Sequence, residues 1–278
     1  MESSNYPVLA FIGAGNMAQA IIGGLLAQGY PAERIWGTGR DLVKLTDLRQ
    51  RLGINISSDN NAAVAAAEVV VLAVKPQLMQ AVAKGLAEQV RRCRPLVISI
   101  AAGISAQSLE SWLGGQVALV RCMPNTPSLV QTGASGLYAN ARVTAQQRTQ
   151  AEQMLAAVGI ALWVEREELI DVVTAVSGSG PAYYFMLMEA MIAAGEAQGL
   201  NRDLSTQLTL QTALGAAKMA LASDAEPAEL RRRVTSPNGT TEQAVLRFQQ
   251  GGLAELVAEA MAACADRGRV MAAELGDA

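Results

Sequence analysis

The sequence predicts an α/β protein in which a doubly wound, mostly parallel sheet is followed by an all-α C-terminal domain. In the first half of the chain, short apolar runs alternate with helical patterns, as in repeated β-α-β units. The glycine turn Gly13–Ala18 joins the first apolar run to the first helical pattern. After Glu165 only helical patterns remain, so we expect one domain over 1–165 and another over 166–278.

Composition restricts the chemistry. Half of the 278 residues are hydrophobic (51%), which is ample for a buried core, and a net charge of −3 does not favour nucleic acid or an anionic membrane as a partner. The chain has no histidine, which excludes imidazole acid–base catalysis and imidazole metal sites, and we expect no metal. Its cysteines, Cys93, Cys122 and Cys264, are scattered, as in a protein of the reducing cytoplasm.

Six strands are expected from β-rich apolar runs, and two further runs are expected to extend the sheet. The six are Val8–Ile12, Arg34–Thr38, Ile54–Ile56, Val69–Val74, Leu96–Ile100 and Val117–Arg121, and the two further runs are Gly136–Ala139 and Ala161–Val164. Helices are expected over Met17–Gln28 and Asp41–Leu52, each followed by a glycine.

The second half is expected to hold five helices. They are Pro181–Gln198, Asp203–Ala222, Glu226–Val234, Thr240–Gln250 and Leu253–Leu275. Between Ala182 and Ala194 the only charge is Glu189, so this helix is apolar on every side. Such a helix must be covered all round, and we expect a partner subunit to share its core.

The glycine turn has the pattern of a dinucleotide site of the Rossmann type. Gly13 permits a sharp turn, Gly15 leaves room for a pyrophosphate against backbone N–H groups, and Ala18 permits close packing of helix on strand. Asn16 and Met17 complete the turn. The strand before it and the helix after it favour nucleotide binding over a glycine turn that merely fits the fold.

The end of the second strand indicates the coenzyme. An acidic residue there would bind a ribose 2′-hydroxyl, but this strand ends in Thr38, Gly39 and Arg40. Arg40 and the Thr38 hydroxyl suit a 2′-phosphate, so NADPH is favoured, with NADH possible. The alternative is that Arg40 is merely solvated at a helix start that Asp41 caps.

Ala73, Val74, Lys75 and Pro76 follow a long apolar strand, at the edge where ligands bind in open α/β sheets. We expect Lys75 to face a phosphate or the nicotinamide ribose, the alternative being a solvated lysine fixed by the proline.

Two more loops carry polar residues. Met123–Pro127 holds a polar turn between two prolines, and Thr235–Thr241 has four hydroxyls and leads into a helix. Free N–H groups at that helix start would bind a carboxylate. Plain helix capping by Ser236 or Asn238 explains the same pattern.

Five motifs in order resemble the pyrroline-5-carboxylate reductase family over nearly the whole chain. They are Gly13–Ala18, Ala73–Pro76, Met123–Pro127, Ser177–Tyr183 and Ser236–Thr241. The resemblance implies reduction of 1-pyrroline-5-carboxylate to L-proline by NAD(P)H, the last step of proline biosynthesis. It also implies a helical dimerisation domain that interlocks two subunits, often within a ring of dimers.

The resemblance assigns carboxylate binding to Ser236, Gly239, Thr240 and Thr241, with the Thr241 hydroxyl near the imine as the catalytic group. It also assigns Asn60 to the adenosine ribose, and implies that the loop faces a nicotinamide held by the other subunit. The family loop usually reads Ser-Pro-Gly-Gly-Thr-Thr, whereas this chain has Asn238 at the first glycine. Asparagine tolerates a positive φ better than other non-glycine residues.

The proposed chemistry is compatible with the lack of histidine. A cyclic imine is readily protonated and then accepts hydride, so the site mainly has to position its substrates. One rival is a β-hydroxyacid dehydrogenase or similar imine reductase, which would use a helical lysine as acid or base. The only C-terminal lysine, Lys218, lacks the asparagine neighbour of that motif. The other rival, an NADPH-binding sensor without catalysis, would need no hydroxyl-rich loop.

Overall fold

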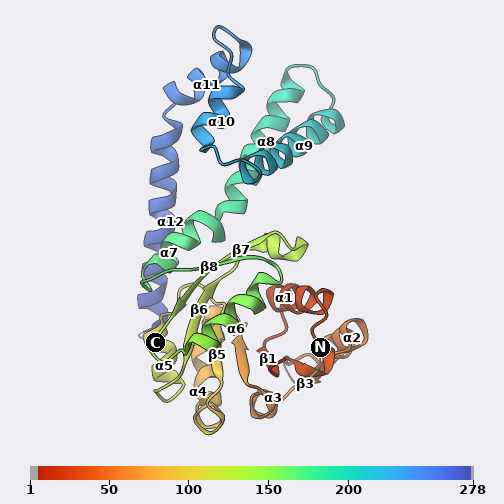
Figure 1. The fold of residues 1–278 in the computed structure, drawn as a ribbon, viewed down its shortest axis with the longest axis vertical. Coiled ribbons are helices and arrows are strands. Elements are labelled where there is room, and N and C mark those ends of the chain that lie inside the picture. The colour runs from red at the N-terminus through yellow and green to blue at the C-terminus, as the bar shows by residue number, and fades with distance from the viewer. Residues whose placement is uncertain (1–5, 277–278) are drawn as a thin grey trace. The chain divides into compact units, whose positions relative to one another are not determined.

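The computed structural model describes residues 6–276, which form two compact units. The first contains residues 6–179 together with residues 263–276, and the second contains Gly180–Ala262. The strands all lie in the first unit (Figure 1). The expected domain boundary after residue 165 lies just beyond the last strand. In the structure, the chain enters the second unit only after Ser179.

Eight strands form one sheet in the order β3-β2-β1-β4-β5-β6-β7-β8. Their bounds are β1 Leu9–Ile12, β2 Ile35–Thr38, β3 Asn55–Ser57, β4 Val69–Leu72, β5 Leu96–Ser99, β6 Leu119–Met123, β7 Gly133–Ala139 and β8 Gly159–Trp163. The first six strands run parallel, β7 is antiparallel to β6, and β8 is parallel to β7. The doubly wound, mostly parallel sheet is therefore confirmed.

Helices cover both faces of the sheet. They are α1 Asn16–Ala27, α2 Leu42–Leu52, α3 Asn60–Ala66, α4 Pro76–Cys93, α5 Ala106–Trp112 and α6 Ala145–Ala156. One core cluster joins Phe11 and Val71 of the strands to α1, α2 and α6, and the other joins Ala10 and Val70 to α3, α4 and α5. Successive strand residues thus enter opposite cores, which explains why these strands are apolar throughout.

Helix boundaries follow local chemistry. The Asp41 carboxylate caps α2 by accepting the N–H groups of Val43 and Lys44, and α2 ends at Gly53 in the left-handed conformation (φ 70°). Thr144 and Gln147 form a reciprocal capping box at the start of α6. The predicted cap and stop of α2 are confirmed.

The predicted bounds of β7 and β8 agree only in part with the structure. β7 begins at Gly133, three residues before the predicted start, because the chain folds back from β6 through a short 3₁₀ turn, Thr126–Val130. Gly133 and Gly159 are adjacent, and a Cβ on Gly159 would lie 1.9 Å from the Gly133 carbonyl oxygen. This close approach of backbones sets the β7–β8 register, and glycine spacing alone did not reveal it.

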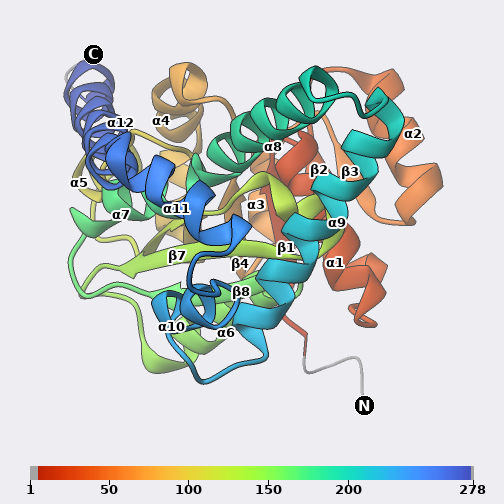
Figure 2. The ribbon, with the colours of Figure 1, turned by 90° about the horizontal axis from the view of Figure 1, so that it is seen from above.

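The second unit is helical, as predicted. It contains α8 Gly180–Ala197, α9 Arg202–Leu221, α10 Pro227–Arg233, α11 Thr240–Gln250 and the first part of α12 Leu253–Gly276. α8 and α9 pack side by side (Figure 2). Within residues 6–276, no helix is long and apolar enough to cross a membrane.

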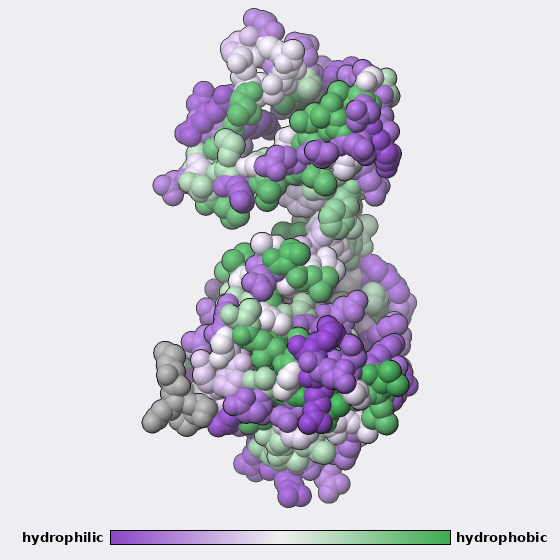
Figure 3. Space-filling view, turned by 90° about the vertical axis from the view of Figure 1, so that its right-hand side faces the viewer, coloured by the Kyte–Doolittle hydropathy of each residue, from purple (hydrophilic) through white to green (hydrophobic). Residues whose placement is uncertain are grey.

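Much of the apolar surface of α8 is exposed in the single chain. Tyr184 is 66% exposed and Met186 is 67% exposed, and Phe185, Leu187 and Met191 are also exposed. Figure 3 shows apolar side chains, in green, on the outside of this helical unit. An apolar helix left uncovered by its own chain needs another protein surface against it.

The last part of α12 belongs to the first unit. A Cβ on Gly103, before α5, would lie 2.9 Å from the Met271 Cβ, and a Cβ on Gly268 would lie 2.9 Å from an Asp171 carboxylate oxygen. Asp171 lies in the short helix α7, Leu169–Val173. Small residues thus let the end of the chain pack closely on the sheet-containing unit, a contact that the sequence did not predict.

Candidate functional site

The expected cofactor loops meet where the strand order reverses. β1 lies between β2 and β4, and the glycine turn follows β1 while residues 73–76 follow β4. A Cβ on Gly13 would lie 2.9 Å from Val74 Cγ1 and 3.0 Å from the Ala73 carbonyl oxygen. The two loops are therefore in contact at the topological switch point, where open α/β sheets bind their ligands.

Gly13 has φ 96°, which an L side chain rarely adopts. Its N–H donates to the Thr38 hydroxyl at 3.2 Å, and the Ala14 N–H donates to the Thr38 carbonyl at 2.8 Å. Thr38 is fully buried, so its hydroxyl is not presented to a ligand. This differs from the expected contact of Thr38 with a 2′-phosphate: Thr38 instead braces the glycine turn.

The start of α1 has the features of an anion cradle. A Cβ on Gly15 would meet no atom within 4 Å, no side chain caps the helix, and its first turn carries no acidic residue. The N–H groups of a first helical turn have no intrahelical partner and carry the positive end of the dipole. Asn16 is exposed and Met17 is partly exposed beside them. The open space and the free donors fit a pyrophosphate.

The remaining cofactor candidates lie at the same edge of the sheet. Arg40 is exposed just after β2, Asn60 is the first residue of α3 after β3, and Lys75 is the exposed N-cap of α4 with Pro76 as its first residue. Neither Arg40 nor Lys75 forms an ion pair within residues 6–276. Both cations are thus available to an anionic ligand.

The Met123–Pro127 loop is held in place by the side chain of Asn125 as well as by its two prolines. The Asn125 side chain, 7% exposed, donates to the Ser177 carbonyl at 2.9 Å and accepts the Ala134 N–H at 2.9 Å. Ser177 lies in a π-helical turn, Thr174–Gly178, that continues α7. One buried amide, that of Asn125, therefore joins the Met123–Pro127 motif to the Ser177–Tyr183 motif.

Cys122 precedes this loop on β6. Complete burial raises the pKa of its thiol to about 12, and a hydrogen bond with Ser135 opposes part of that rise. A buried neutral thiol is a poor nucleophile, so Cys122 is a packing residue.

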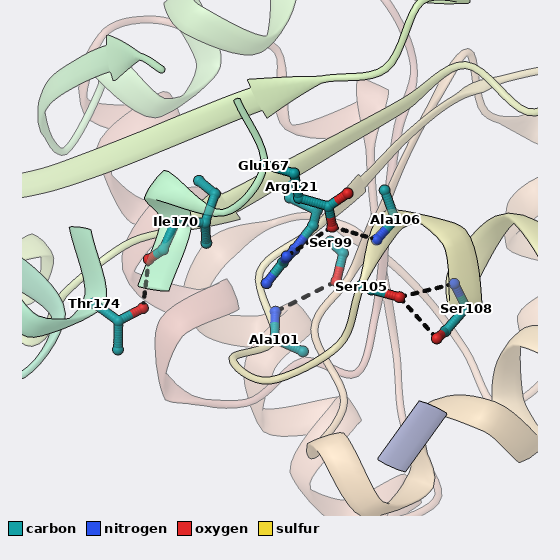
Figure 4. Close-up of polar contacts among 9 residues, drawn as sticks. All are labelled: Ser99, Ala101, Ser105, Ala106, Ser108, Arg121, Glu167, Ile170 and Thr174. Carbon is teal, nitrogen blue, oxygen red and sulfur yellow. Dashed lines mark hydrogen bonds and ion pairs between the residues drawn. The ribbon is translucent and has the colours of Figure 1, made fainter. Parts of the chain in front are cut away.

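A buried ion pair lies near the carboxyl end of β6, at the edge of the sheet that carries the cofactor loops. The sequence analysis did not predict this pair. The Arg121 guanidinium lies 2.7 Å from a Glu167 carboxylate oxygen, and that oxygen also accepts the Ala106 N–H at 2.6 Å (Figure 4). The Arg121 side chain is only 6% exposed. The pair links β6 and the start of α5 to the segment that precedes α7. An arginine inside an apolar strand was the available signal, because a buried charge needs a partner.

The predicted carboxylate loop lies in the helical unit and leads into α11. The N-cap of α11 is Gly239, and no side chain caps the helix, so capping by Ser236 or Asn238 is excluded. The Gly239 N–H donates to the Ser236 carbonyl at 3.0 Å. The Ser236, Thr240 and Thr241 hydroxyls are exposed beside the free N–H groups of the first turn. This donor-rich helix start fits a carboxylate.

Asn238 has φ 56°, in the left-handed region. The departure from the family sequence is therefore accommodated, because asparagine adopts this conformation more readily than other side chains. Its N–H donates to the Glu242 carboxylate at 2.8 Å, which closes the turn across the start of α11.

Lys218, the residue on which the dehydrogenase alternative depends, is exposed in the last turn of α9. It forms no ion pair within residues 6–276. A lysine at a helix C-terminus is stabilised by the helix dipole, which accounts for it without a catalytic role.

Two family models match the chain. Residues 167–271 match the model described as pyrroline-5-carboxylate reductase dimerisation, and residues 8–103 match the one described as NADP oxidoreductase coenzyme F420-dependent. A pyrroline-5-carboxylate reductase of Pseudomonas aeruginosa is 56% identical over 270 residues, 97% of this chain and 98% of the relative.

Solved structures agree with these matches. A pyrroline-5-carboxylate reductase from Coxiella burnetii superposes with a TM-score of 0.93 at 44% identity, covering 96% of this chain and 99% of that one. A pyrroline carboxylate reductase of Plasmodium falciparum, solved with NADP bound, superposes with a TM-score of 0.85 at 28% identity, covering 96% and 98%.

Proposed function

The chain belongs to the pyrroline-5-carboxylate reductase family, and we propose that it reduces 1-pyrroline-5-carboxylate to L-proline. The imine carbon takes up a hydride from a reduced nicotinamide dinucleotide and the ring nitrogen takes up a proton, so that proline and the oxidised coenzyme are released. The uncapped, hydroxyl-rich start of α11 is the observation that carries this proposal, because it offers donors for the substrate carboxylate.

The cofactor is a nicotinamide dinucleotide held at the switch point of the sheet, and when bound it supplies the hydride. Gly13 and Gly15 shape the turn, Asn16 and Met17 lie at the helix start beside the pyrophosphate, and Asn60 lies toward the adenosine ribose. Ala73, Val74, Lys75 and Pro76 form the opposite wall. The contact between Gly13 and residues 73–74 supports this arrangement.

We propose that the enzyme prefers NADPH and that Arg40 sets this preference. It is exposed just after β2 and carries no ion pair in residues 6–276. A planar guanidinium binds a 2′-phosphate through paired hydrogen bonds.

On the substrate side, Ser236, Gly239, Thr240 and Thr241 hold the carboxylate. The Thr241 hydroxyl also hydrogen-bonds the ring nitrogen, so that the imine carbon is oriented toward the hydride donor. A threonine hydroxyl is a weak acid and serves here to orient the substrate and to pass on a proton. Orientation of this kind accounts for much of the acceleration of such a reaction.

A second copy of the chain completes the enzyme. The exposed apolar residues of α8, among them Tyr184, Phe185 and Met186, support dimerisation through the helical unit, which is also the part matched by the dimerisation model. We propose that the α11 loop of one subunit serves the cofactor site of the other. Mixing a Gly13→Ala chain with a Thr241→Ala chain tests this, because hybrid dimers regain one intact site only if the site is shared.

The decisive assay follows NADPH oxidation with added 1-pyrroline-5-carboxylate and identifies proline as the product. NADPH binding without turnover would overturn the proposal and favour a sensor. Turnover of a hydroxyacid semialdehyde in place of the cyclic imine would favour a dehydrogenase.

A further inference from the structure

A cavity of about 710 Å³ lies in the sheet-containing unit at the edge opposite the glycine turn. β5 and β6 begin at this edge, and β7 ends there because it runs antiparallel to β6. The cavity is formed by the end of α4, the segment between α5 and β6, and the residues after β7. Its volume falls within the range of small-molecule sites.

The charged residues that line this cavity are all arginines. Arg91, Arg94 and Arg142 line it, and its lining contains no aspartate or glutamate. Within residues 6–276, neither Arg91 nor Arg94 forms an ion pair. Among the described residues, only Arg142 of the three arginines pairs with a carboxylate, that of Glu110, and a bound anion would reduce the repulsion between the positive charges.

Arg91 and Arg142 are positioned by their surroundings. The Arg91 stem lies against Gly114, where a Cβ would be 3.2 Å from Arg91 Cδ. Arg142 is held through its Nε, which lies 3.0 Å from a Glu110 carboxylate oxygen, so its terminal nitrogens remain available. The same oxygen accepts the Gln116 N–H at 3.1 Å and thereby fixes the cavity wall.

Arg94 stands where a glycine would be less strained. It ends α4 in the left-handed conformation, with φ 50° and ψ 49°, and its N–H donates to the Val90 carbonyl. Glycine is the usual residue at such a helix end. Stabilisation of the helix dipole explains a basic residue near the end of α4, and Arg91 and Arg92 in the last turn already provide it. It does not explain why Arg91, Arg94 and Arg142 surround one cavity.

We propose that this arginine cavity, lined by Arg91, Arg94 and Arg142, binds a small multiply charged phosphate anion. Two unpaired guanidinium groups and the free end of a third match an acceptor with several oxygens, and paired N–H donors bind phosphate oxygens strongly. The site lies at the opposite end of the strands from the cofactor loops, so the anion binds alongside the cofactor. The proposal does not depend on the reaction that the enzyme catalyses.

The test is isothermal titration of the full-length protein with inorganic pyrophosphate, in the presence of saturating NADP⁺ so that the cofactor site is filled. The test variant is Arg91→Ala with Arg94→Gly, in which glycine suits the left-handed backbone and protects the fold. Arg92→Ala is the control for the loss of one positive charge from the same helical turn, because Arg92 does not line the cavity. Thermal melting without ligand checks that all three proteins are folded.

Wild type and Arg92→Ala are expected to bind pyrophosphate equally, and the double variant at least about tenfold more weakly. Equal binding by the double variant, equal weakening in Arg92→Ala, or absence of binding by wild type would each overturn the proposal.

Discussion

The Thr38 hydroxyl accepts a hydrogen bond from the Gly13 N–H at 3.2 Å, so the end of β2 fixes the glycine turn that follows β1. Thr38→Val keeps the side-chain shape but leaves this donor unpaired. We expect a loss of about 1–2 kcal/mol in unfolding free energy together with weaker NADPH binding. Chemical denaturation and titration with NADPH measure the two effects. Thr38→Ser should retain both properties, and a valine variant indistinguishable from wild type would remove Thr38 from the support of the turn.

Arg40→Ala is expected to raise the KM for NADPH about tenfold or more while changing the KM for NADH little, because only NADPH carries the 2′-phosphate. Steady-state kinetics with both coenzymes check this. Lys44→Ala is the control, since Lys44 is exposed on the neighbouring helix and carries the same charge. Equal changes for the two coenzymes would show that Arg40 does not contact the 2′-phosphate.

Thr241→Ala is expected to lower kcat about tenfold or more without changing NADPH affinity, because the ring nitrogen loses its orienting hydroxyl. Thr241→Ser should restore most of the rate. The control is Thr235→Ala, whose hydroxyl already donates to the Arg231 carbonyl within the chain. Unchanged turnover in Thr241→Ala would exclude the residue from the reaction.

Asn238→Gly is expected to retain activity and to change the unfolding free energy by less than about 1 kcal/mol, because glycine adopts φ 56° readily. Asn238→Val should cost about 1–2 kcal/mol and raise the KM for the imine, because a β-branched residue resists the left-handed conformation. Thermal melts and substrate titrations of the pair provide the test. A valine variant with normal KM would show that the conformation of Asn238 does not shape the substrate loop.

Burial raises the pKa of Asp171 above its usual value of 3.8, and Glu167 adds to the rise, while Arg121 and Arg269 oppose it. The folded state therefore binds the proton more tightly than the unfolded state, and this group's contribution to stability declines as the pH rises through the folded-state pKa. Asp171→Asn removes that decline.

Relative to wild type, the Asp171→Asn variant should gain stability as the pH rises from 4 toward 7. Urea unfolding across this range measures the difference, with the exposed Asp224→Asn as control. A constant difference between variant and wild type would contradict the assignment.

Much of the fold was predictable because its signals are local. Apolar runs marked the strands, Asp41 and Gly53 marked the ends of α2, and the change to helical patterns after Glu165 was correct. The glycine turn was identified because strand, turn and helix follow one another in the sequence. Family motifs then assigned the α11 loop, whose residues have no periodic signal of their own.

Other features depend on residues far apart in the chain. Arg121 and Glu167 are 46 positions apart, and only the folded sheet brings the guanidinium and the carboxylate to 2.7 Å. Likewise, the sequence predicts Thr38 as a cofactor ligand, whereas in the structure its hydroxyl is buried and braces Gly13.

By itself, the sequence determined the order of the elements, the glycine turn with a coenzyme candidate at Arg40, and the hydroxyl-rich loop before α11. Backbone conformation and periodicity are properties of neighbouring residues, so they can be read along the chain. Only the tertiary structure decided which groups remain available to ligands. It buried the Thr38 hydroxyl, left the start of α11 uncapped, and gathered Arg91, Arg94 and Arg142 around one cavity. Whether a group can bind a ligand depends on how deeply it is buried and on contacts with residues distant in the sequence. Both are determined only when the chain folds.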